Sequence, residues 1–336
     1  MSLNNNVKSA LSFLLRMGLS VGLLWYVFSK IDMEGTKRVL QSADITYISL
    51  AGFVFVIVNG IVLLRWFIFI KALDLSVSVK DVVRNYFYGL FGNLFLPTAI
   101  GGDIIKVIGL CKDSSQKPKV VASVLLDRLS GFASIIVIEL VMLLIGYPFI
   151  AGDKVLSTAI VMIGLGSTVC AVILFNERIY SFGCRVFDRL PKVKQGFMSM
   201  HYDIALLKSG HKSIEGYKAI AVSCCSQAVF AFSWFLTAKA LGQETAFFHF
   251  IAFVPMLCVA SSFPSIGGLG VREAGAVYLF SKVGMESGVA VSLSLINFFF
   301  MVMVGLVGGF TYVYTLSVGR IQCYSQDAVG VGPGDA

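Results

Sequence analysis

The sequence contains few charged residues, since only 14% of its 336 residues are Asp, Glu, Lys or Arg, against about 25% in a typical soluble domain. It has three histidines and no HExxH, DxD, CxxC or Walker-type phosphate-loop motif. These absences argue against a water-soluble enzyme, a metal- or His-dependent active site, and ATP as the energy source. We expect neither a cofactor nor a metal ion.

The seven cysteines have no spacing typical of a metal site. Most lie in or beside apolar runs, where cysteine packs as a small hydrophobic side chain. Cys224 and Cys225 are adjacent, but side chains at consecutive helix positions do not face each other. We therefore predict no structural disulfide.

Apolar residues make up 57% of the chain and occur in long runs. About 20 mostly apolar residues cross the roughly 30 Å of bilayer hydrocarbon as a helix. The runs that satisfy this condition are 11–28, 45–70, 120–145, 155–175, 219–241 and 289–314. The first contains Arg16 and has no cleavage-site pattern, so we interpret it as a span and not as a signal peptide. The sequence predicts an all-α polytopic membrane protein with about six full spans.

Two further apolar runs, 86–100 and 246–263, are too short for an ordinary span and end in proline and glycine. Lys80, Asp81 and Arg84 form a charged break before the first of them. We predict that both runs are re-entrant hairpins built from broken helices.

The formal net charge of +8 comes from an excess of lysine and arginine in the loops on one side of the spans. Such loops face the cytoplasm, so we expect a multi-pass protein of the cell (inner or plasma) membrane with both termini cytoplasmic. The basic segment 177–212 alternates with apolar residues, which favours an interfacial segment on anionic lipid over a nucleic-acid site. Residues 1–316 form one predicted transmembrane domain, and the Gly-rich tail 317–336 is predicted to be disordered.

The two short runs resemble each other where they end. Residues 95–102 read FLPTAIGG and residues 262–268 read SFPSIGG. A basic residue follows the second glycine by four positions in each case, Lys106 and Arg272, with an acid nearby, Asp103 and Glu273. Three predicted spans separate the runs, so they enter the membrane from opposite faces, as in the inverted repeats of transporters. Close helix packing at glycines is the simpler alternative, but it does not account for the charges.

A helix that begins after a Gly-Gly turn offers unpaired N–H groups and the positive end of its dipole. With Lys106 or Arg272 one turn further on, each turn could hold an anion such as a phosphate. Charged residues inside spans are functional candidates by default. Arg128 could snorkel, pair with Asp103, or hold a lipid phosphate, and Arg65 is expected to snorkel to the headgroups.

Glu139 follows Arg128 by 11 residues, which places both on nearly the same helix face. An interhelical hydrogen bond and a substrate or proton role are both open for its carboxyl group.

The motifs that carry a family resemblance are Asn93 with Leu96-Pro97 and Gly101-Gly102-Asp103, then Asp127-Arg128, and finally Pro264 with Gly267-Gly268-Leu269-Gly270 and Glu273. Over nearly its whole length the chain resembles the flippase-like membrane family named after the transmembrane region of lysylphosphatidylglycerol synthase. Lys106 stands where the family pattern has arginine, which keeps the charge but loses bidentate phosphate geometry.

The resemblance implies movement of a phospholipid or a polyprenyl-linked lipid between leaflets. The family's bifunctional synthases add a soluble aminoacyl-transferase domain, and this sequence ends shortly after its last predicted span, so we do not expect it to aminoacylate lipids.

The candidate substrate-binding residues are Asn93, Pro97, Gly101, Gly102, Asp103, Lys106, Asp127, Arg128, Glu139, Pro264, Gly267, Gly268, Gly270, Arg272 and Glu273. The leading hypothesis is a lipid flippase or scramblase without enzymatic activity. A membrane-embedded glycosyltransferase acting on a polyprenyl phosphate, with Asp103, Asp127 or Glu273 as base, and a membrane scaffold are the alternatives. Whether the chain forms a homo-oligomer is left open.

Overall fold

The computed structural model describes residues 37, 39–95, 101–112, 116–145, 211–261 and 268–329, with single positions between 154 and 169. Within these ranges the chain is helical and contains no strand, which confirms the predicted all-α class. The predicted span 11–28, most of 155–175, and nearly all of the basic segment 177–212 lie outside the described residues.

Among the described residues, four long helices are apolar enough to cross a membrane, each over 27 or 28 residues. They are α3 (Ile45–Ala72), α6 (Lys117–Leu144), α11 (His211–Ala240) and α14 (Ser287–Val329). These helices coincide with the predicted runs 45–70, 120–145, 219–241 and 289–314. At about 1.5 Å per residue, 28 residues extend for about 42 Å, enough for a tilted span. The chain is a multi-pass membrane protein.

Four shorter helices lie between the long ones in the part of the chain that the structure describes. They are α4 (Val79–Phe95), α5 (Gly101–Lys112), α12 (Phe247–Ala260) and α13 (Val271–Ser281). The order long, short, short, long therefore occurs twice among the described helices, first as α3 to α6 and then as α11 to α14.

Helix α4 begins seven residues before the predicted run 86–100, so the charged residues do not form a break. The backbone N–H of Lys80 donates to Ser78 Oγ (3.2 Å), which caps the helix start. Asp81 lies in the first turn, where the helix dipole favours a negative charge, and pairs with Arg84 at 2.9 Å.

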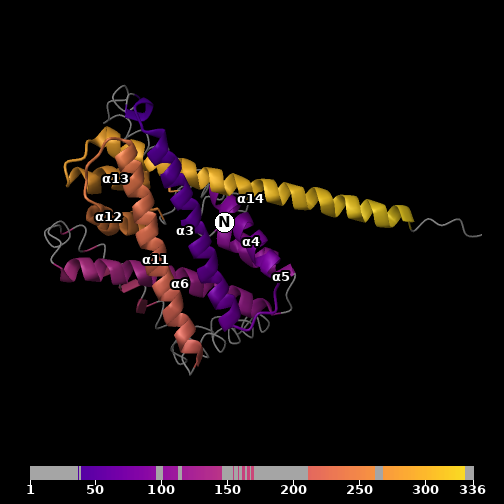
Figure 1. Ribbon diagram of the computed structural model, residues 1–336. Helices are drawn as coiled ribbons and strands as arrows, with labels where there is room; N and C mark the ends of the chain where they lie inside the picture. The colour runs from indigo at the N-terminus through magenta and orange to yellow at the C-terminus, as the bar shows by residue number, and fades with distance from the viewer. Residues whose placement is uncertain are drawn as a thin grey trace, which may run out of the picture.

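Helices α3 and α11 run antiparallel along each other (Figure 1). The N–H of Asp44, which precedes α3, donates to the carbonyl of Ala240 at the end of α11 (2.9 Å). Helix α14 packs on α4, and α12 contacts α6. The first group of helices, α3 to α6, and the second group, α11 to α14, therefore contact each other through these pairs as well.

The α14–α4 contact is close because α14 presents glycines there. A Cβ atom at Gly308 would overlap the carbonyl of Phe87, and one at Gly309 would overlap the Phe91 ring. Small residues at such positions let helix backbones approach in membranes.

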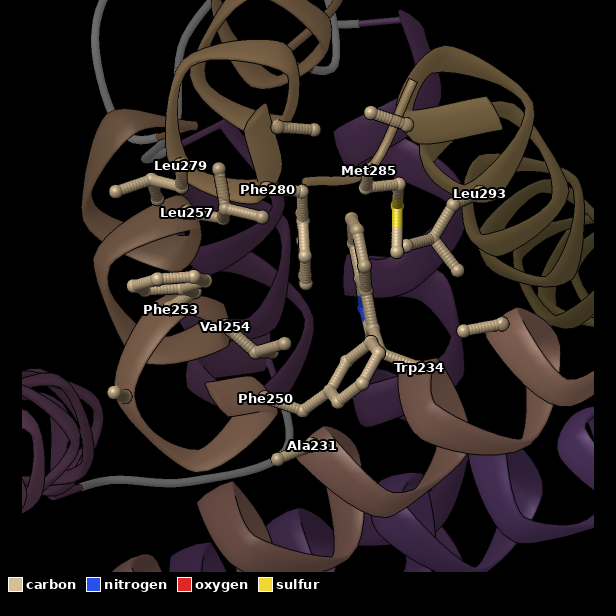
Figure 2. Close-up of a cluster of buried hydrophobic side chains, with 14 of the residues drawn as sticks. Ala231, Trp234, Phe250, Phe253, Val254, Leu257, Leu279, Phe280, Met285 and Leu293 are labelled. Atoms are coloured by element: carbon tan, nitrogen blue, oxygen red, sulfur yellow. The ribbon is translucent and has the colours of Figure 1, made fainter. Parts of the chain in front are cut away.

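Apolar side chains fill a core within each group of helices. Trp66, Phe69 and Tyr86 belong to the core of the first group, and the second is built around Trp234, Phe250 and Phe280 (Figure 2). In the second core the Trp234 and Phe280 rings are stacked with centroids 6.3 Å apart. A third cluster, which includes Phe55, Leu236 and Phe300, joins α3 to α11 and α14.

Helix α14 continues to Val329 and extends away from the other helices (Figure 1). It thereby enters the segment 317–336, whose disorder stays a prediction.

Candidate functional site

Helix α5 begins at the Gly-Gly sequence, and a side chain from α4 caps its start. The Gly102 N–H donates to Asn93 Oδ1 (2.9 Å), which satisfies one of the amides that a helix N-terminus leaves unpaired. A Cβ atom at Gly102 would overlap the Gly89 carbonyl and Asn93 Oδ1. Glycine is therefore required for the close approach of α4 and α5, and Asn93 is engaged in holding the turn.

Asp103 lies at the centre of a buried charge cluster formed by α5 and α6. Its Oδ2 accepts a hydrogen bond from Arg128 Nε, and its Oδ1 lies 3.5 Å from Lys106 Nζ. The Lys106 ammonium also lies over the rings of Trp66 and Tyr86, at 5.3 and 4.9 Å from their centroids. Lys106 is thus enclosed by an acid and two aromatic rings. The Arg128 side chain, in contrast, keeps 37% of its surface exposed.

Arg65 of α3 does not snorkel, and that prediction is wrong. Its Nε donates to Asp127 Oδ1 at 2.6 Å and its Nη1 to Ser223 Oγ at 3.3 Å, while only 9% of its side chain is exposed. Ser223 in turn donates to Ser130 Oγ (3.4 Å). An arginine snorkels when no anion is within reach; here Asp127 offers a buried partner, so the charge is neutralised inside the bundle.

The second group of helices has its own buried ion pair at the start of α13. Glu273 Oε1 accepts from Arg272 Nη2 (2.7 Å) and from Ser294 Oγ (2.9 Å), and its Oε2 accepts from the Gly270 N–H (2.6 Å). The Arg272 guanidinium also lies over the Phe298 ring at 4.9 Å. Gly270 has φ +85°, a conformation that favours glycine. These contacts tie α13 to α14.

A cavity of about 230 Å³ lies between α3, α6, α11 and α12. Its polar lining residues are Arg65, Arg128, Ser226, Gln227 and Cys258; its remaining lining is largely apolar. Cys258 Sγ donates to Gln227 Oε1 (3.9 Å). The cavity therefore holds two arginines in a wall that is otherwise largely apolar.

Glu139 lies one helical turn beyond the cavity on α6. It is 2% exposed, and neither carboxyl oxygen has a hydrogen-bond partner among the described residues. Of the two roles left open for Glu139, the interhelical hydrogen bond is not formed within that part of the chain.

The structure brings together some of the predicted site residues and separates others. Asn93, Gly101, Gly102, Asp103, Lys106 and Arg128 lie at the α4–α5–α6 junction, Asp127 joins Arg65 beside them, and Gly268, Gly270, Arg272 and Glu273 lie at the start of α13. Pro97, Pro264 and Gly267 lie outside the described residues. Within that described portion, no group of three or more His, Cys, Asp or Glu side chains is arranged to hold a metal ion.

Sequence reasoning missed Arg65, Gln227 and Cys258 as cavity residues. Arg65 did carry a signal, because a charge inside an apolar span is costly unless it has a purpose. Gln227 and Cys258 carried none, because polar uncharged residues are common in membrane helices and their pairing spans 31 residues.

Comparison with known proteins agrees with this architecture. The family model of the lysylphosphatidylglycerol synthase transmembrane region matches residues 13–309. A UPF0104 membrane protein of Pyrococcus horikoshii is 25% identical over 318 residues, covering 87% of this chain and 92% of that protein. No solved structure matches the chain significantly. The chain belongs to the family of the lysylphosphatidylglycerol synthase transmembrane region.

Proposed function

We propose that this protein moves a phospholipid or a lipid-linked headgroup between the two leaflets of the cell membrane, as a flippase or scramblase. The observation that carries the proposal is the cavity between helices of both groups, with Arg65 and Arg128 in its wall. Guanidinium groups bind phosphate oxygens with two parallel hydrogen bonds. Every phospholipid and every polyprenyl-phosphate lipid carries such a phosphate.

The ion pairs prepare these arginines for an exchangeable anion. Asp127 orients Arg65, and Asp103 orients Arg128 while leaving part of its side chain open. A headgroup phosphate would share each guanidinium group with the paired carboxylate, and would not bind an arginine that has no other anionic partner. Binding of moderate strength favours transport, because the headgroup must also leave.

Transport fits these residues better than catalysis. Asp103, Asp127 and Glu273, the acids considered as bases for a glycosyltransferase, each accept a hydrogen bond from an arginine. A carboxylate engaged in this way is a poor proton acceptor for a substrate hydroxyl.

We further propose that the two groups of helices form an inverted repeat, each with one re-entrant pair, within about six full spans. The recurring helix order and the antiparallel arrangement of α3 and α11 support this proposal. A repeat of this kind places its substrate site near the bilayer midplane, between the halves. The cavity is bounded by α3 and α6 from one group and by α11 and α12 from the other, which supports a site between the two halves. The cytoplasmic location of both termini, and binding of anionic lipid by residues 177–212, are part of the same proposal.

A lipid-movement assay tests the proposed function. Purified protein is reconstituted with a tail-labelled fluorescent phosphatidylglycerol, and dithionite bleaches the probe in the outer leaflet. We expect wild-type protein to expose nearly all of the probe, and Arg128→Ala to slow this exposure at least tenfold, which corresponds to a rise of about 1.4 kcal/mol in the rate-limiting barrier.

Arg84→Ala is the matched control, because Arg84 pairs with Asp81 at a partly exposed position outside the cavity. It should move the probe at the wild-type rate. Equal rates for wild type and Arg128→Ala would remove the cavity from the mechanism, and no movement by folded wild-type protein of either this probe or a polyprenyl-phosphate probe would refute lipid transport.

A further inference from the structure

Glu139 differs from the other buried acids of the described helices. Asp103, Asp127 and Glu273 each have a basic partner within 4 Å, whereas both oxygens of Glu139 are buried without a hydrogen-bond partner in the same part of the chain. An ionised carboxylate without a partner in an apolar setting is far less stable than the neutral acid. The site therefore favours a carboxyl group that carries a proton.

The position of Glu139 relates it to the cavity. Arg128, Gly131, Phe132 and Ile135 of α6 line the cavity, and Glu139 follows Ile135 by four residues on the same helix face. The carboxyl group thus continues the cavity-lining stripe about 6 Å further along the helix axis.

The charged and titratable groups around this part of α6 lie on the helices that pack against it. Arg65 of α3 and Cys258 of α12 border the cavity, α11 contributes the neutral Ser226 and Gln227, and Asp103 and Lys106 of α5 lie at the opposite end, beyond Arg128. Among the described residues none of these is hydrogen-bonded or ion-paired to Glu139. The basic residues of the cavity wall are Arg65 and Arg128. Arg65 pairs with Asp127, which is adjacent to Arg128, so both lie toward the end of the cavity away from Glu139.

A proton suits this site better than a metal ion. Sodium, magnesium and calcium ions require several oxygen ligands at once, and the described helices supply no cluster of acidic, His or Cys side chains. A proton needs a single carboxylate oxygen and a path, which water in the cavity can provide.

We propose that Glu139 is a proton-binding site that couples proton movement to the movement of the headgroup anion through the cavity, an inference that rests on the proposed lipid transport. When the cavity opens to one face of the membrane, a proton from water binds the Glu139 carboxylate and forms the neutral acid. When it opens to the other face, the acid returns the proton to water. One proton then crosses with each headgroup and offsets its negative charge.

Infrared difference spectroscopy tests the proton site without any lipid transport. Purified wild-type protein near neutral pH should have a carbonyl band from a protonated carboxylic acid. The band should disappear in Glu139→Gln, which keeps the size of the side chain, and persist in Glu215→Gln, the same change at an acid of α11 that pairs with Lys218. A wild-type spectrum without this band, or a band that persists in folded Glu139→Gln, would overturn the proposal.

A pH gradient tests the coupling. Vesicles containing the fluorescent phosphatidylglycerol are held at a one-unit pH difference, with valinomycin and equal potassium to remove the membrane potential. One proton per lipid shifts the leaflet ratio of the probe about tenfold at equilibrium. Glu139→Gln should still let the probe equilibrate but should keep the ratio near one.

The outcomes separate the two proposals. If wild-type protein moves the probe and the gradient leaves the ratio at one, the coupling is refuted and lipid transport stands. If wild-type protein moves no probe although the infrared band is present and lost in Glu139→Gln, lipid transport fails and the proton site stands.

Discussion

Asp127 neutralises Arg65, a buried arginine of the cavity wall, and this makes Asp127 a structural residue. Arg65 and Asp127 are 9% and 5% exposed and lie 2.6 Å apart. In a buried pair, loss of one partner leaves an uncompensated charge, which costs more than the pair itself contributes. An exposed pair has no such asymmetry.

Asp127→Asn should therefore lower the free energy of unfolding by about 3–5 kcal/mol. Asp81→Asn, the same substitution in the more exposed Asp81–Arg84 pair, should lower it by at most about 1 kcal/mol. Reversible unfolding in mixed detergent micelles measures both changes. Equal, small effects would mean that Arg65 finds another partner or reaches water.

The residue scale is where sequence reasoning succeeded least. The Arg65–Asp127 bond joins residues 62 positions apart. A local sequence pattern does not predict which helices pack against each other, so this pair could not be predicted. The Arg128–Asp103 bond was among the alternatives that the sequence left open for Arg128. Glu139 could be placed on the Arg128 face from helical periodicity alone, whereas its lack of a partner depends on the packing of other helices.

At the scale of single elements, hydropathy was sufficient to locate the four long helices of the described ranges. Each predicted run lies within its helix to within a residue or so at the ends, because the cost of exposing polar backbone to lipid forces a long apolar run to be helical. The start of α4 was wrong, since charged residues can also occupy a first helical turn. The glycines of α14 indicate a site of close helix packing, but the sequence does not predict that α4 is the helix that packs there.

Packing of α14 on α4 can be tested at Gly308. Gly308→Ala should destabilise the protein by about 1–3 kcal/mol, because the new methyl group would overlap the Phe87 carbonyl. Gly216→Ala is the control: nothing lies within 4 Å of a Cβ atom at this position of α11, so alanine should stabilise by up to about 1 kcal/mol. Thermal unfolding in detergent compares the two, and a neutral Gly308→Ala would contradict the close α14–α4 contact.

At the scale of the whole molecule, the two groups of helices must face opposite ways for the cavity to lie between inverted halves. The link between α3 and α4 and the link between α11 and α12 then lie on opposite sides of the membrane. The first link lies beside Lys71, Lys80 and Arg84, and this excess of basic residues predicts that it faces the cytoplasm.

Cysteine labelling in intact cells tests this arrangement. In a variant without the native cysteines, Ser76→Cys should react only with membrane-permeant maleimides, and Glu244→Cys should also react with impermeant ones. Both positions are exposed, so access depends on the side of the membrane. Labelling of both from one side would contradict the inverted arrangement.

The most direct measurement of the central claim is photo-crosslinking by a phospholipid whose reactive group lies beside its phosphate. If headgroups pass through the cavity, crosslinks should map to its lining on α6 and α11, near Phe132, Ile135 and Phe230, and Arg128→Ala should remove most of them. Crosslinks confined to outward-facing side chains such as Val137, Leu144 and Phe310, and unchanged by Arg128→Ala, would contradict lipid passage through this cavity.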